Sequence, residues 1–233
     1  FSGSLPSGLW NLANLRELDL GNNQFSGTLP ASIGDLTALR ELLLYANQFS
    51  GPLPSEIGSL SQLRTLAIHQ NGFSGALPAT IGGLASLQEI LLHTNEFSGP
   101  IPEEWGGLSA LTFLRIEDND LNGAIPSTFG NLTNLTALMA GNNSFTGSIP
   151  VELANLDHLI TLDLRFNSLT GTIPPELAGL PALQVLYLQF NQLSGPIPSA
   201  LGGLTELKEL MLHSNALTGT IPEELGGLTN LER

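Results

Sequence analysis

Hydrophobic residues recur along this chain every 24 residues, without an insertion or deletion. Nine complete units cover residues 12–227, and partial units of residues 1–11 and 228–233 flank them. Counted from Leu12 as position 1, positions 1 and 4 are always Leu, and positions 7 and 9 are Leu or Ile in nearly every unit. Positions 7 and 9, such as Leu18 and Leu20, point to the same side of a short strand because they lie two residues apart. The repeat predicts one strand per unit, stacked on the next at about 4.8 Å into a parallel sheet.

Three further columns of residues indicate how each unit turns away from its strand. Position 12 is Asn in all nine units, and an Asn side chain can bond to backbone groups that a turn leaves unpaired. Position 16 is always Gly, which permits backbone angles that a side chain forbids. Position 19 is always Pro, which ends a strand ladder because it has no N–H to donate. These columns predict a repeated coil rather than an ordinary globule.

The units read LxxLxxLxLxxNxFSGxLPxxIGx in the first half of the chain and LxxLxxLxLxxNxLTGxIPxxLGx in the second. This consensus resembles the plant-type leucine-rich repeat of receptor-like kinase ectodomains and polygalacturonase-inhibiting proteins, over essentially the whole chain. The resemblance implies an α/β repeat solenoid, coiled as a right-handed superhelix. It places a parallel β-sheet on the concave face, a second short strand near Gly-x-Ile-Pro, and 3₁₀ turns on the convex face.

The same resemblance bears on the extent of the protein. We expect residues 1–233 to form one continuous array. Solenoid ends need caps with a polar outer face, and cell-surface members of this family usually carry cysteine-bearing caps. The chain has no cysteine. We therefore expect it to be an interior fragment of a longer protein, with caps and any effector domain outside it.

Composition excludes several classes of partner. The formal net charge is −14, with Lys208 as the single lysine, so the surface would repel nucleic acid and anionic membranes. No run of eighteen apolar residues is present, so no transmembrane helix is expected. The lack of cysteine removes disulfides, thiolate metal sites and cysteine nucleophiles.

The variable positions 6, 8, 10, 11 and 13 are expected to face the concave surface and to carry the function. Aromatic residues, Met and Arg gather there in units seven to nine, as they do in binding hot spots. The alternative interpretation is that Phe166 and Phe190 cover the edge of the core. The predicted partner-binding residues are Tyr45, His69, His93, Arg115, Arg165, Phe166, Tyr187, Gln189, Phe190, Met211 and His213.

Two other groups on this surface have less specific patterns. His69 and His93 fall in neighbouring strands, where a pH-sensitive contact is conceivable, but solvated surface histidines are the commoner case. The run from Asp118 to Gly123 matches the opening of a calcium-binding loop, but Phe129 stands where such a loop needs a bidentate Glu. We therefore expect no metal site and no cofactor.

The chain lacks HExxH, GxSxG and GxxxxGK[ST] motifs, so we expect it not to be an enzyme. Asn131, Asn134 and Asn142 each begin an N-x-[ST] sequon and are candidates for glycosylation. Some family members bind ice through flat threonine arrays, but position 17 alternates among Thr, Pro, Ala and Ser.

The sequence thus favours a recognition module that binds a protein, peptide or glycan on its concave face, within a larger receptor-like protein. One alternative is a structural component of an extracellular assembly. Another is the repeat domain of an intracellular GTPase or kinase. The resemblance implies an extracellular or cell-surface location, and a cytoplasmic one stays open.

Overall fold

The computed structural model describes all residues from Phe1 to Arg233. Each complete unit contributes one strand from its positions 6 to 8 to a nine-stranded parallel sheet. Neighbouring strands pair position for position, as in Leu42 with Leu66. The strands are β2 (Glu17–Asp19), β4 (Glu41–Leu43), β6 (Thr65–Ala67), β8 (Glu89–Leu91), β10 (Phe113–Arg115), β12 (Ala137–Met139), β14 (Thr161–Asp163), β15 (Val185–Tyr187) and β17 (Glu209–Met211).

A second set of short strands follows the Asn column. Seven form one parallel sheet and two form another. Unit seven lies between these two sheets and has no such strand. Its Ser168 and Thr170 N–H groups still donate to the Phe145 and Gly147 carbonyls of unit six at 2.8 Å, so units six and seven stay hydrogen-bonded here. The strands are β1 (Ser2–Gly3), β3 (Gln24–Gly27), β5 (Gln48–Gly51), β7 (Gly72–Gly75), β9 (Glu96–Gly99), β11 (Asp120–Ala124), β13 (Ser144–Thr146), β16 (Ser194–Pro196) and β18 (Ala216–Thr218).

A five-residue 3₁₀ helix follows the proline of each unit. Its third residue, such as Trp105, is in most units buried against the core. None of these helices combines the length and apolar character needed to span a membrane. The helices are η1 (Ser7–Asn11), η2 (Ala31–Asp35), η3 (Ser55–Ser59), η4 (Ala79–Gly83), η5 (Glu103–Gly107), η6 (Ser127–Asn131), η7 (Val151–Asn155), η8 (Pro175–Gly179), η9 (Ser199–Gly203) and η10 (Glu223–Gly227).

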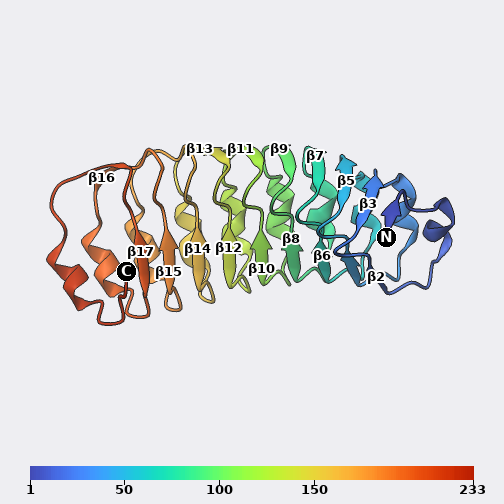
Figure 1. The fold of residues 1–233 in the computed structure, drawn as a ribbon. Helices are drawn as coiled ribbons and strands as arrows, with labels where there is room; N and C mark the ends of the chain where they lie inside the picture. The colour runs from blue at the N-terminus through green and yellow to red at the C-terminus, as the bar shows by residue number, and fades with distance from the viewer.

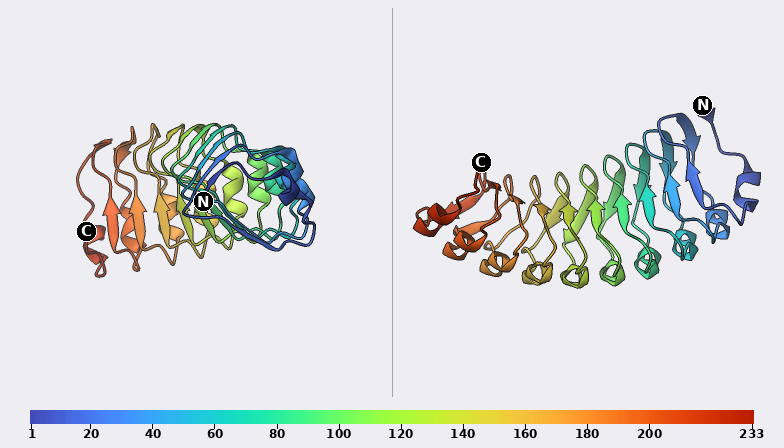
Figure 2. Two further views of the ribbon diagram at one scale, coloured as in Figure 1. Left: turned by 45° about the vertical axis from the view of Figure 1, so that its right-hand side comes forward. Right: turned by 90° about the horizontal axis from the view of Figure 1, so that it is seen from below.

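The units stack into an elongated, curved and twisted array with the chain termini at opposite ends (Figure 1). The 3₁₀ helices line its outer, convex side (Figure 2). A single cluster of 55 buried apolar residues runs through the array. The predicted solenoid with parallel strands and 3₁₀ turns is confirmed, including the second short strand, and all of its helices are 3₁₀ helices.

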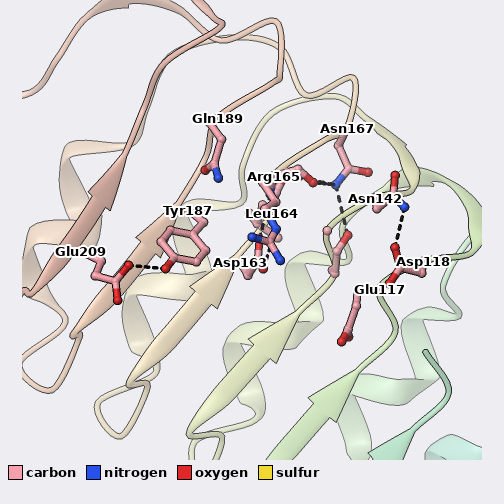
Figure 3. A network of polar contacts seen from close by, with 12 residues as sticks. Glu117, Asp118, Asn142, Asp163, Leu164, Arg165, Asn167, Tyr187, Gln189 and Glu209 are labelled. Carbon is pink, nitrogen blue, oxygen red and sulfur yellow. Dashed lines mark hydrogen bonds and ion pairs between the residues drawn. The ribbon is translucent and has the colours of Figure 1, made fainter. Parts of the chain in front are cut away.

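The Asn column ties each coil to the one before it. The Asn167 side chain accepts a hydrogen bond from the Phe145 N–H at 2.9 Å. Its amide group donates to the carbonyls of Ala140, Leu164 and Arg165, each at 3.1 Å (Figure 3). One side chain therefore satisfies four backbone groups, two of them in the previous coil, and fixes the place where each strand ends.

Candidate ligand-binding surface

Position 11 lies just beyond each strand of the nine-stranded sheet, where the chain turns. In all nine units its backbone is left-handed, with φ between 52° and 58°. Short polar residues such as Asn and Asp tolerate this conformation, whereas a bulky side chain adopts it at an energetic cost. Seven units carry small or polar residues here, and two carry Phe166 and Phe190.

These two phenylalanines are exposed and lie against each other. Phe166 is 45% exposed and Phe190 is 41% exposed. Their rings stack with centroids 4.2 Å apart, and the His213 ring meets Phe190 edge-on at 4.9 Å. Neither phenylalanine belongs to the buried core cluster. The stack is thus an apolar surface in a strained backbone setting.

Units seven to nine, which carry this stack, also carry a polar network of Asp163, Arg165, Tyr187 and Glu209 (Figure 3). Asp163 is almost fully buried, and its Oδ2 lies 3.2 Å from Arg165 Nε. The Arg165 guanidinium lies 5.4 Å from the centroid of the Tyr187 ring. The Tyr187 hydroxyl donates to the Glu209 carboxylate, and this hydrogen bond is the main cause that raises the pKa of Tyr187. Burial raises the pKa of Asp163. The network fixes both Arg165 and Tyr187.

The structure corrects the predicted exposure of several residues in this region. Tyr187 and Met211 are half-buried, and they stand opposite each other in register on the neighbouring strands β15 and β17. Gln189 is 7% exposed, and its Oε1 has no hydrogen-bond partner. The repeat pattern does not distinguish Asp163 and Glu209 from other variable residues, because their roles come from contacts within one coil and between neighbouring coils.

The prediction that His69 and His93 are solvated surface histidines is wrong. Their rings stack at 4.2 Å, and the Tyr45 ring stacks on His69 at 5.0 Å. Tyr45 lies over Gly21, whose lack of a side chain leaves room for the ring. His93 is only 8% exposed, and its pKa is lowered to about 4 by burial first and then by Arg115 and His69. Burial and Arg115 also lower the pKa of His69.

Further along the same surface, Arg115 forms an ion pair with Glu117. Glu117 is buried, and its second carboxylate oxygen, Oε2, has no partner. Asp118 and Asp120 are exposed at the rim, where Asp118 accepts a 2.5 Å hydrogen bond from the Asn142 side chain (Figure 3). No three His, Cys, Asp or Glu side chains are grouped so that they could hold a metal ion.

The three sequon asparagines are all exposed. The Asn134 amide donates to the Ser109 carbonyl at 2.8 Å, as Asn230 does to Thr205 four units later. The Asn142 amide donates to Asp118, whereas Asn131 ends η6 with no side-chain hydrogen bond. Asn131 is therefore the sequon asparagine whose side chain makes no hydrogen bond within the protein.

Stacked coils, each with one inner strand and one outer 3₁₀ helix, define a repeat solenoid whose varied residues lie on the strand side. Residues 4–100 match the model of the leucine-rich repeat region, and residues 110–132, 134–193 and 206–228 match models of the leucine-rich repeat. The chain belongs to the leucine-rich-repeat proteins. A search of curated protein sequences found no match.

Similar solved structures include two plant receptors. The peptide hormone receptor RGFR1, in complex with RGF2, is 38% identical over 99% of this chain and 41% of its own, with a TM-score of 0.86. The ectodomain of the Arabidopsis receptor kinase HAESA, in complex with an IDA peptide hormone, is 37% identical over 95% of this chain and 37% of its own, with a TM-score of 0.91. The chain thus spans about two fifths of these receptor chains.

A plant ice-binding protein is also similar, with 28% identity over 95% of this chain and 71% of its own, and a TM-score of 0.85. The same fold therefore carries different activities. A function for this chain has to be argued from its own surface residues.

Proposed function

We propose that this array is a non-enzymatic recognition module that binds a peptide on its concave face, as part of a larger receptor-like protein exposed outside the cell. The observation that carries this proposal is the stacked, exposed Phe166–Phe190 pair on the strand side of units seven and eight. The peptide complexes of similar plant receptors support the choice of a peptide.

The backbone setting of the pair supports a role in binding rather than in folding. A phenylalanine in left-handed conformation costs stability, and strained positions cluster at ligand sites. Two adjacent units have a phenylalanine in this conformation, and neither ring packs against the hydrophobic core. A partner that covers the rings would remove their apolar surface from water, and this burial would contribute to the free energy of binding.

The neighbouring residues suit a peptide ligand. Arg165 and Tyr187 are held in place by Asp163 and Glu209, so little side-chain entropy would be lost when a ligand binds. Tyrosine and arginine are among the residue types enriched in the hot spots of protein interfaces. Gln189 adds a buried amide with an unpaired oxygen, which can accept a hydrogen bond from a peptide N–H.

The proposal is tested with peptides selected from a random display library on the wild-type protein. The double variant Phe166→Asn/Phe190→Asn is expected to bind them at least about tenfold more weakly. A tenfold loss of affinity is about 1.4 kcal/mol of binding free energy, and the removal of one hot-spot side chain costs more than this. Its unfolding midpoint in urea should stay equal or rise, because Asn tolerates the left-handed backbone.

The matched control is Val151→Asn, which removes an exposed apolar residue from η7 on the convex side. This variant should bind the peptides as wild type does. Equal affinity of wild type and the double phenylalanine variant, or a selection that yields no binding peptide, would refute the proposal.

A further inference from the structure

Four side chains on the strand side carry a buried polar atom without a hydrogen-bond partner, and all four stand at position 10. The atoms are Nδ1 of His69, Nδ1 of His93, Oε2 of Glu117 and Oε1 of Gln189. Three of these residues, His93, Glu117 and Gln189, are more than nine-tenths buried. Buried polar groups normally have partners, because desolvation without a hydrogen bond is costly. All buried side-chain polar atoms that lack a hydrogen-bond partner therefore belong to this one position of the repeat.

Glu117 is the charged member of this column. Arg115 directs both Nε and Nη2 at the same oxygen, Oε1, and leaves Oε2 free. At position 10 of the next unit stands Gly141, which has no side chain to bond with Glu117. On the other side His93 is stacked on His69. Within the protein, no donor reaches the second carboxylate oxygen.

The charge around Glu117 is negative. Two arginines, Arg115 and Arg165, stand among four carboxylates, Glu117, Asp118, Asp120 and Asp163. Both arginines already form ion pairs, and neither Asp118 nor Asp120 pairs with a cation. The lowered pKa values of His69 and His93 keep both imidazoles neutral at neutral pH, so they add no repulsion to an incoming positive charge.

We propose that Glu117 is a specificity subsite that accepts an arginine or lysine side chain of the peptide ligand through its free Oε2. This inference rests on the proposed function and specifies the chemistry of its ligand. A buried carboxylate with one free oxygen is suited to a charge-assisted hydrogen bond from an ammonium or guanidinium group. The neutral imidazoles of His93 and His69 offer further hydrogen bonds to the same segment of the peptide.

The position of Glu117 relative to the phenylalanine pair sets the spacing in the ligand. Glu117 lies in unit five, and Phe166 and Phe190 lie in units seven and eight. Neighbouring strands are about 4.8 Å apart, which places the two subsites about 10–15 Å apart. An extended peptide rises about 3.3 Å per residue, so the basic residue should stand about three or four positions from an aromatic or aliphatic residue.

The first test is the composition of peptides selected from the random library on three proteins. Peptides selected on wild type should be enriched in Arg or Lys at the stated distance from an apolar residue. Selection on Glu117→Gln should lose the basic residue and keep the apolar one. Selection on Phe166→Asn/Phe190→Asn should show the reverse. If the peptides selected on the wild-type protein share an apolar residue but no basic residue, the subsite is refuted and the proposed function is not.

The second test is a double-mutant cycle with one selected peptide and its Arg→Gln or Lys→Gln analogue. The analogue should bind wild type at least about tenfold more weakly, whereas Glu117→Gln should distinguish the two peptides by less than about threefold. The control Asp157→Asn, an exposed carboxylate outside this surface, should behave as wild type.

Because the analogue is also measured on unaltered protein, the test stands even if Glu117→Gln folds poorly. Equal binding of both peptides to wild type, or an equal loss in wild type and Glu117→Gln, would overturn the subsite. A failure of the proposed function is recognised separately, by peptides whose affinity does not depend on Phe166 and Phe190.

Discussion

Single residues at the same position of the repeat differ in environment according to their neighbours one coil away. At position 10, Tyr45 lies flat over Gly21, His69 stacks on Tyr45, and His93 stacks on His69. This ladder buries His93 and keeps it neutral. At position 11, the shared left-handed backbone makes Phe166 and Phe190 exceptional.

We predict that His93 contributes to the loss of stability in acid. Its pKa is lowered from 6.5 to about 4 in the folded protein, so below pH 6.5 the unfolded chain takes up the proton first. The stabilising contribution of neutral His93 is complete above pH 6.5 and is lost progressively as the pH falls toward 4. Asp163 has a raised pKa in the folded protein, so its own contribution to stability becomes more favourable as the pH falls.

The measurement is the urea midpoint at about pH 7 and about pH 4.5. His93→Phe keeps an aromatic ring in the stack without a titrating group, and it should lose less stability between these pH values than wild type. The exposed His158 is the control, and His158→Gln should lose as much as wild type. If His93→Phe loses as much stability as wild type, neutral His93 does not stabilise the fold.

The sequence predicted which residues of the site share a surface but not how deeply each is buried. The period of 24 residues places Tyr45, His69 and His93 at one position. It does not state that adjacent rings will stack, because stacking depends on side-chain rotamers. The sequence likewise does not state that Glu117 is buried or that Arg115 pairs with it through a single carboxylate oxygen.

At the scale of elements, strands and 3₁₀ helices stack with their counterparts in neighbouring units. The 3₁₀ helices approach closely at position 23, which is usually glycine. A methyl group added to Gly106 in η5 would lie 2.5 Å from Thr128 Cβ and 2.7 Å from the Thr128 carbonyl oxygen. By contrast, a methyl group at Gly203, the last residue of η9, meets no atom within 4 Å.

We therefore predict opposite effects of two glycine-to-alanine substitutions. Gly106→Ala should lower the free energy of unfolding by about 1–3 kcal/mol, as overpacking does. Gly203→Ala should leave it unchanged or raise it by up to about 1 kcal/mol, because alanine reduces the entropy of the unfolded chain. Urea unfolding followed by circular dichroism measures both. Equal effects would mean that the 3₁₀ helices are not closely packed at position 23.

These elements could be predicted from the sequence because each column has one physical task. Leu18 and its equivalents face the core, Asn23 and its equivalents end the strand, and Pro30 and its equivalents precede the 3₁₀ helix. The close approach at position 23 could not be predicted in the same way. Ala154 and Ala178 occupy this position in η7 and η8, so the sequence shows a preference for small residues without its cause.

At the scale of the whole molecule, the array is quasi-one-dimensional, and each coil contacts only its neighbours. A ligand that crosses several coils can therefore read one side chain from each. The concave face of this chain offers an imidazole ladder, a buried carboxylate and a phenylalanine pair in that order. The net charge of −14 favours a basic ligand over an acidic one.

The central claim is that the strand side of units seven to nine holds the peptide, and photochemical cross-linking tests it most directly. A selected peptide carries a photoreactive phenylalanine analogue at its apolar position, and mass spectrometry identifies the protein residues that it labels. The account predicts labels on Phe166, Tyr187, Phe190, Met211 or His213. Labels confined to the 3₁₀ helices η6 to η9 on the convex side would contradict it.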